Sequence, residues 1–163
     1  MHLCDLKFVL VFFVFVFPSQ PLVEIMYFIG IGGALQALAT PALGYGFPHF
    51  GYFFFFAEHG CVILTALYYV FIENRKFTFY SVLRSMLYLT LIGAGVLAFD
   101  LMLGSNYMFL LHKPGSASIL DFLGPWPWYL VSCEGIALVT FSLLYAPTHV
   151  SAMLLRKKKT GES

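Results

Sequence analysis

Four polar side chains lie in long apolar stretches and could act together: Cys4, His59, Glu134 and Gln36. A cysteine thiol becomes a nucleophile when a nearby imidazole takes its proton, and the imidazole works best when a third group fixes its tautomer. A thiol, an imidazole, a carboxylate and an amide therefore suggest a nucleophile, a base and an orienting group. Such a set can perform covalent catalysis with the thiol as the attacking group.

The composition sets the class of protein that must position these groups. Hydrophobic residues make up 60% of the 163 residues, charged residues make up 10%, and the mean hydropathy is +0.85. A soluble domain has about half apolar and about a quarter charged residues. The apolar runs are continuous, whereas the strands of a membrane barrel alternate. We therefore predict an all-α, polytopic helical bundle embedded in a lipid bilayer, with no affinity for nucleic acid.

Proline and charged residues divide the chain into five predicted membrane spans. The first apolar run is too short to cross a bilayer unless it includes the residues before Phe8. In the second span, Gly30/Ala34 and Gly33/Ala37 form small-residue pairs that let another helix approach closely, and residues 93–98 are expected to do the same in the fourth. The predicted spans are residues 1–17, 22–39, 50–72, 81–103 and 126–146, the last ended by Pro147.

Basic residues predict the orientation. Arg75, Lys76 and Arg84 mark the connection between the third and fourth spans as cytoplasmic, and residues 156–159 mark the tail in the same way. The chain then forms one transmembrane domain, residues 1–155, with a basic cytoplasmic tail, residues 156–163. We expect it to be a multi-pass protein of the cell membrane.

The predicted orientation also brings the four polar residues to one depth. Counted from the cytoplasmic end of each span they lie about 12–14 residues along the helix, which is roughly 18–21 Å at 1.5 Å per residue. The alternative is that Cys4 is a packing residue and that the polar groups join helices by hydrogen bonds. His-x-Cys pairs occur at His2/Cys4 and His59/Cys61. Residues two apart on a helix point in nearly opposite directions, so we expect no metal and no cofactor.

The outer loops supply candidate substrate-binding residues. They lie on the side nearer to the polar layer and could form a lid for a phosphate headgroup, or they could be ordinary solvated loops. Glu58 lies about 100° around the helix from His59 and could face a different span. The substrate-binding candidates are His2, Glu58, His49, Asn106, Lys113 and Asp121.

Motifs along the whole chain resemble the YwaF family of bacterial multi-pass membrane proteins. They are residues 2–5 (His-Leu-Cys-Asp), 34–41, 44–50, 59–60 (His-Gly), 104–109, 112–114 and 124–129. That family is similar, more distantly, to a eukaryotic membrane group that includes a phospholipid acyltransferase working through a cysteine and a histidine. The resemblance implies that Cys4 accepts the acyl group and that His59 is the base. Members of the family normally carry at least one more span before this cysteine, so we expect a shortened start.

Two other classes of function remain open. In the first, Glu58, His59, Glu134 and Asp100 form a polar track for protons or ions, although the chain shows none of the internal repeats that many transporters carry. In the second, the protein is a membrane scaffold and the polar layer holds its helices together. Acyl transfer on a phospholipid substrate is the leading hypothesis.

Overall fold

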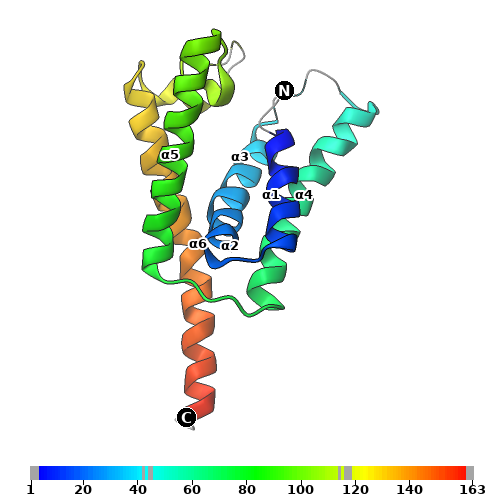
Figure 1. Cartoon of the computed structure of the whole chain (residues 1–163), viewed down its shortest axis with the longest axis vertical. Helices are drawn as coiled ribbons and strands as arrows, with labels where there is room; N and C mark the ends of the chain where they lie inside the picture. The colour runs from blue at the N-terminus through cyan, green and yellow to red at the C-terminus, as the bar shows by residue number, and fades with distance from the viewer. Residues whose placement is uncertain (1–3, 42, 44–45, 114, 116–118, 161–163) are drawn as a thin grey trace.

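The structure, a computed structural model, describes residues 4–41, 43, 46–113, 115 and 119–160, with side chains from residue 10 to 148 except at 119. The described part is all helical (Figure 1). Its helices are α1 (Cys4–Val16), α2 (Gln20–Ile25), the π-helical segment η1 (Met26–Gly30), α3 (Ile31–Ala39), α4 (Phe50–Phe71), α5 (Phe79–Leu103), the short helices η2 (Tyr107–Phe109) and η3 (Ile119–Leu123), and α6 (Trp128–Thr160).

Residues 20–39 form one helix that contains the π segment. Pro21 lies in its first turn, where a missing N–H costs nothing, and the helix stops at Thr40 before Pro41. The π segment packs against helices from both halves of the sequence, namely α1, α4, α5 and α6. Its Phe28 is fully buried and its ring contacts those of Phe77 and Phe141.

The helices form two groups, which Figure 1 shows side by side. One group contains α1, the helix of residues 20–39, and α4, and the other contains α5 packed against α6. We call the end that carries residues 72–78 and the α1–α2 turn the basic end, because Arg75, Lys76 and Arg84 are there. The opposite end, which carries residues 40–49 and the α5–α6 connection, is the loop end.

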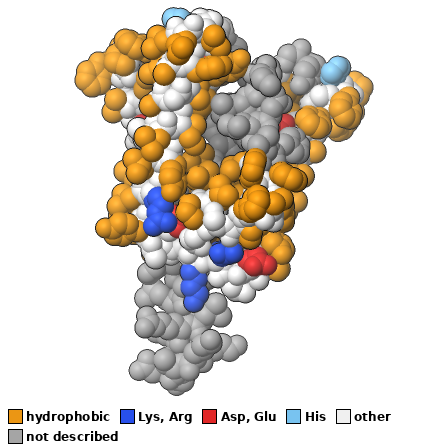
Figure 2. All heavy atoms as spheres, in the orientation of Figure 1, with side chains coloured by type: hydrophobic (Ala, Val, Ile, Leu, Met, Phe, Trp, Pro, Cys, Tyr) orange, Lys and Arg blue, Asp and Glu red, His pale blue; other side chains and the backbone are white. Residues whose placement is uncertain are grey.

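Four helices, rather than the expected five, are long and apolar enough to span a membrane in the described part of the chain. They are Gln20–Ala39, Phe50–Phe71, Phe79–Leu103 and Trp128–Thr148. The first predicted span is wrong at this point: α1 has 13 residues. At 1.5 Å per residue it is about 20 Å long, against about 30 Å of hydrocarbon. The exposed surface remains strongly apolar, as Figure 2 shows for one face, so the helices are embedded in a lipid bilayer.

Helix α6 does not end at Pro147, as the sequence had predicted. It continues to Thr160 with Pro147 inside it and extends beyond the other helices at the basic end (Figure 1). Pro147 lacks the N–H that would donate to the Leu143 carbonyl four residues earlier, so the helix continues with one hydrogen bond fewer. Beside it, the Thr148 hydroxyl donates to the Tyr145 carbonyl at 2.7 Å. The residues predicted as a separate basic tail therefore begin inside this helix.

The small residues confirm close packing in one helix and contradict it in another. A Cβ atom on Gly30 would lie 3.1 Å from Val62 Cγ1, so this glycine lets α4 approach, and Ala34 is fully buried. Gly33 faces open space. The predicted close-packing face at residues 93–98 of α5 is wrong, because a Cβ on Gly93 or Gly95 would meet nothing within 4 Å.

Candidate functional site

His59 is the fully buried centre of the candidate site, half-way along α4. Its Nδ1 lies 2.7 Å from the carbonyl oxygen of Phe55, and the two rings are 4.3 Å apart. A carbonyl oxygen only accepts hydrogen bonds, so Nδ1 carries the proton and donates it. The neutral ring then has its lone pair on Nε2. The backbone of α4 thus fixes the tautomer, and Nε2 is the nitrogen that can take up a proton.

The start of α1 lies at the level of His59. Both α1 and α4 run from the loop end to the basic end, side by side (Figure 1). The Tyr69 hydroxyl donates to the Val14 carbonyl at 2.8 Å, which sets the register of the two helices. Cys4 precedes Val14 by as many residues as His59 precedes Tyr69. The backbone at Cys4 is therefore level with His59 to within about one helical turn of 5.4 Å.

Two candidates fall outside the described atoms. The whole of His2 and the side chain of Cys4 belong to the part of the chain that the structure leaves undescribed. Glu58 is described and is buried, next to His59 in sequence and one turn before Val62, which lies against Gly30.

Gln36 and Glu134 form hydrogen bonds with residues other than His59. The Gln36 amide donates to the Thr40 hydroxyl on its own helix, at 3.2 Å. Glu134 Oε1 accepts a hydrogen bond from the Thr90 hydroxyl, also at 3.2 Å, and so links α6 to α5. The Phe55 carbonyl therefore holds the His59 ring, and the orienting role expected for Gln36 or Glu134 stays a prediction.

The candidates at the loop end have clear local contacts. Asn106 folds the connection after α5, because its Oδ1 accepts from the N–H groups of Leu111 and His112 at 3.0 and 3.1 Å. Lys113 Nζ lies 5.5 Å from the centre of the Tyr129 ring, a cation–π distance. His49 accepts from the Gly51 N–H through Nδ1 and so caps α4, and Asp121 is exposed in η3.

Asp100 also folds the loop end. It is fully buried near the end of α5, and its place in the polar track that the sequence suggested stays a prediction. Its Oδ1 accepts from the Ser105 hydroxyl at 2.6 Å and from the Tyr107 N–H at 3.0 Å. These bonds hold the chain where Gly104, with φ of +65°, turns it back from the helix.

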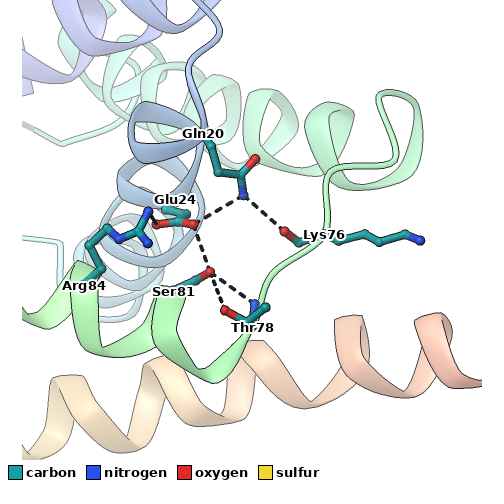
Figure 3. A network of polar contacts seen from close by, with 6 residues as sticks. All are labelled: Gln20, Glu24, Lys76, Thr78, Ser81 and Arg84. Atoms are coloured by element: carbon teal, nitrogen blue, oxygen red, sulfur yellow. Dashed lines mark hydrogen bonds and ion pairs between the residues drawn. The ribbon is translucent and has the colours of Figure 1, made fainter.

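A second buried polar cluster, at the basic end, was missed by the sequence analysis (Figure 3). Its centre is Glu24 on α2, which is only 2% exposed. Glu24 Oε1 accepts from Ser81 Oγ at 2.9 Å and from Gln20 Nε2 at 3.3 Å, and Oε2 pairs with Arg84 Nη1 at 3.3 Å. The signal was an acidic residue at the start of an apolar run, with a serine and an arginine three residues apart at the start of another.

The Glu24 cluster also fixes two helix starts. Ser81 Oγ accepts from the Thr78 N–H at 3.1 Å in a capping box that begins α5. Gln20 donates as well to the Lys76 carbonyl at 3.1 Å. The cluster therefore ties the helix of residues 20–39 to α5, across the two helix groups.

Among the described residues, no group of three or more His, Cys, Asp or Glu side chains is placed to hold a metal ion. The described chemistry is thus that of a buried imidazole, carboxylates and amides.

Apolar spans with an apolar exposed surface define a multi-pass helical membrane protein. The model of the TMEM164 family matches residues 1–145, and the chain belongs to this family. We found no match among curated proteins and none among solved structures.

Proposed function

We propose that this protein transfers an acyl group between membrane phospholipids through a thioester on Cys4, with His59 as the base. The observation that carries the proposal is the state of His59. It is fully buried in a membrane-spanning helix, and its Nδ1 lies 2.7 Å from the Phe55 carbonyl oxygen, which favours the tautomer with the proton on that nitrogen. An imidazole at this depth is costly for a protein to keep, which favours a functional role.

The proposed reaction has two balanced steps. In the first, Nε2 takes the proton of the Cys4 thiol, and the thiolate attacks the ester carbonyl carbon of a phospholipid. The carbon–oxygen bond of the ester breaks, and the lysophospholipid leaves with the proton from His59. In the second, His59 takes the proton of an acceptor hydroxyl, which attacks the thioester, and the carbon–sulfur bond breaks to return the thiol.

Two further observations support this reaction. The register set by the Tyr69–Val14 hydrogen bond starts α1 at the level of His59. The motif around Cys4, His-Leu-Cys, resembles that of an acyltransferase group, and the other motifs resemble the YwaF family. The resemblance to the acyltransferase group implies that the Cys4 thiol is the nucleophile. With the basic end in the cytoplasm of a cell-membrane protein, the reaction would take place in the outer half of the bilayer.

Trapping of the acyl-enzyme tests the proposal directly. The purified protein is placed in phosphatidylcholine vesicles with a phospholipid that carries a radiolabelled acyl chain. We expect label on the protein that hydroxylamine releases, and transfer of label to an added lysophospholipid. Cys4→Ser should abolish both, whereas Cys61→Ser, at an exposed cysteine on α4, should leave both unchanged.

Either of two results would overturn the proposal. One is acyl transfer that survives Cys4→Ser. The other is a proton flux across the vesicle membrane that depends on Glu58 and His59 and ignores Cys4, without acyl transfer. The second result would favour the proton-pathway hypothesis.

A further inference from the structure

The contact between α3 and α6 stops part of the way along the two helices. Toward the basic end the helix groups touch closely. The Tyr27 hydroxyl donates to the Leu144 carbonyl at 2.9 Å, and the rings of Phe28 and Phe141 are 5.7 Å apart. A Cβ on Gly32 would lie 3.2 Å from Cε1 of the Phe141 ring, so this glycine leaves room for the Phe141 side chain against the helix of residues 20–39.

One turn closer to the loop end, the same faces are exposed. The two helices are antiparallel, so the residues that follow Gly32 on α3 face those that precede Phe141 on α6 (Figure 1). These are Leu35 and Gln36 on one side and Leu138 on the other. Leu35 is 47% exposed and Leu138 is 40% exposed, and Gln36 is exposed as well. Phe141 is therefore the last close contact between the two helices, and their faces separate from there toward the loop end. We call Phe141 the floor of this separation.

The separation begins at the level of His59. Gly30 lies against Val62, and the helix of residues 20–39 is antiparallel to α4. Gly33 lies three residues from Gly30 toward the loop end, and His59 lies three residues from Val62 in the same direction. Gly33 and His59 are therefore at about the same level. The exposed residues Leu35 and Gln36 thus begin within one turn of the level at which the proposed chemistry takes place.

Polar groups lie on these faces although both helices span the membrane. Gln36 is on the exposed side of α3, and Glu134 lies one turn beyond Leu138 on α6. Gln36 bonds to the Thr40 hydroxyl and Glu134 to the Thr90 hydroxyl. An amide and a carboxylate can each form further hydrogen bonds, and polar atoms in hydrocarbon are costly, so an additional partner with polar atoms at this depth is favoured. A phospholipid supplies both kinds of surface, because its acyl chains are apolar and its ester carbonyls accept hydrogen bonds.

We propose that one phospholipid enters sideways between α3 and α6, in the half of the bilayer nearer the loop end. One acyl chain lies against Leu35 and Leu138 above the Phe141 floor, and the Gln36 amide donates to the ester carbonyl. The assignment of this ester as the reacting group rests on the proposed function. The binding of the lipid at this place does not.

Photocrosslinking tests the site without a need for catalysis. The probe is a phosphatidylcholine with a diazirine in one acyl chain, in phosphatidylcholine vesicles, and the variant Cys4→Ser is used so that no turnover occurs. We expect crosslinks concentrated on peptides that contain Leu35 and Leu138, and we expect excess unlabelled phospholipid to compete with them. Crosslinks at Leu64 and Leu101, which are each 67% exposed, serve as the control for general lipid contact.

Substitutions then block the site. Leu138→Trp should fill the separation and lower the competed crosslinking at Leu35 about tenfold, which corresponds to about 1.4 kcal/mol. Gln36→Leu should lower it by a smaller factor. Leu64→Trp, a matched substitution at an exposed leucine of α4, should leave it unchanged.

Three results would overturn the site: equal crosslinking at Leu35, Leu64 and Leu101, crosslinking that Leu138→Trp leaves intact, or protein–protein crosslinks through Leu138 that show a second copy there. Failure of acyl transfer is a separate outcome. Crosslinking at Leu35 and Leu138 without any thioester on Cys4 would retain the lipid site and refute the proposed function.

Discussion

Glu24 and His59 are both buried polar groups in membrane helices, but their surroundings differ. Glu24 has partners on both oxygens, drawn from α2 and α5, and so it joins the two helix groups. His59 is held through Nδ1 by the carbonyl of its own helix, which leaves the other ring nitrogen as the basic one. The comparison suggests that the basic end stabilises the fold and that the region around His59 performs the chemistry.

The largest expected effect is on activity, at His59. An asparagine amide can still donate to the Phe55 carbonyl but cannot act as a base. We expect His59→Asn to lower acyl transfer about 10²–10⁴-fold, the range for loss of a general base, with little change in thermal stability in detergent. His59→Leu, which also loses the hydrogen bond, should be less stable than His59→Asn. If His59→Asn kept its acyl transfer activity, the region around His59 would not be the site of the proposed chemistry.

The next effect is on stability, at Arg84. Without the guanidinium, the buried carboxylate of Glu24 keeps its hydroxyl and amide donors but loses its counter-charge. The Arg84 side chain is 41% exposed, so solvent screens part of this interaction, and we expect Arg84→Met to lower the free energy of unfolding by about 1–3 kcal/mol, less than for a fully buried pair. Unfolding in detergent, followed by circular dichroism, measures the change.

The double variant Glu24→Leu/Arg84→Met sharpens this prediction. It removes both charges, so it should be closer to the wild type than Arg84→Met alone. Glu73→Gln, at an exposed position in the connection between α4 and α5, is the control and should change stability little. Equal losses in the single and double variants would show that the charge pair is not what matters.

A medium effect is expected where α3 meets α4. Gly30→Leu would force a side chain against Val62, and overpacking typically costs about 1–3 kcal/mol. Gly95→Leu, on the open face of α5, is the matched control and should cost much less. The same unfolding measurement applies, and a similar loss at Gly95 would mean that another helix covers this face of α5.

The smallest effect is expected at Tyr69. Tyr69→Phe removes one hydrogen bond to the Val14 carbonyl and should cost about 1 kcal/mol. If this bond also sets the register of α1, acyl transfer should fall more than stability does. Acyl transfer measured per folded protein distinguishes a shift in the register of α1 from a loss of stability. A fall in activity that unfolding alone explains would contradict the inference that Cys4 lies at the level of His59.

The sequence by itself determined the class of protein and most helix boundaries. Long apolar runs bounded by proline and charge have one stable solution in a bilayer, because a helix satisfies its own backbone. The sequence also identified His59, since an ionisable residue inside such a run is conspicuous. Within the residues that the structure describes, the sequence overcounted the spans, because the 13 residues of α1 are too few to cross a bilayer.

Only the tertiary structure decided which polar groups meet. Depth along a span can be counted from the sequence, but the side of a helix that meets a neighbour depends on how the helices pack. That is why Glu134 is bonded to Thr90 and Gln36 to Thr40, although both were counted to the depth of His59. For the same reason the Glu24 cluster was missed: Glu24 and Ser81 are 57 positions apart in sequence and meet only when α2 packs on α5.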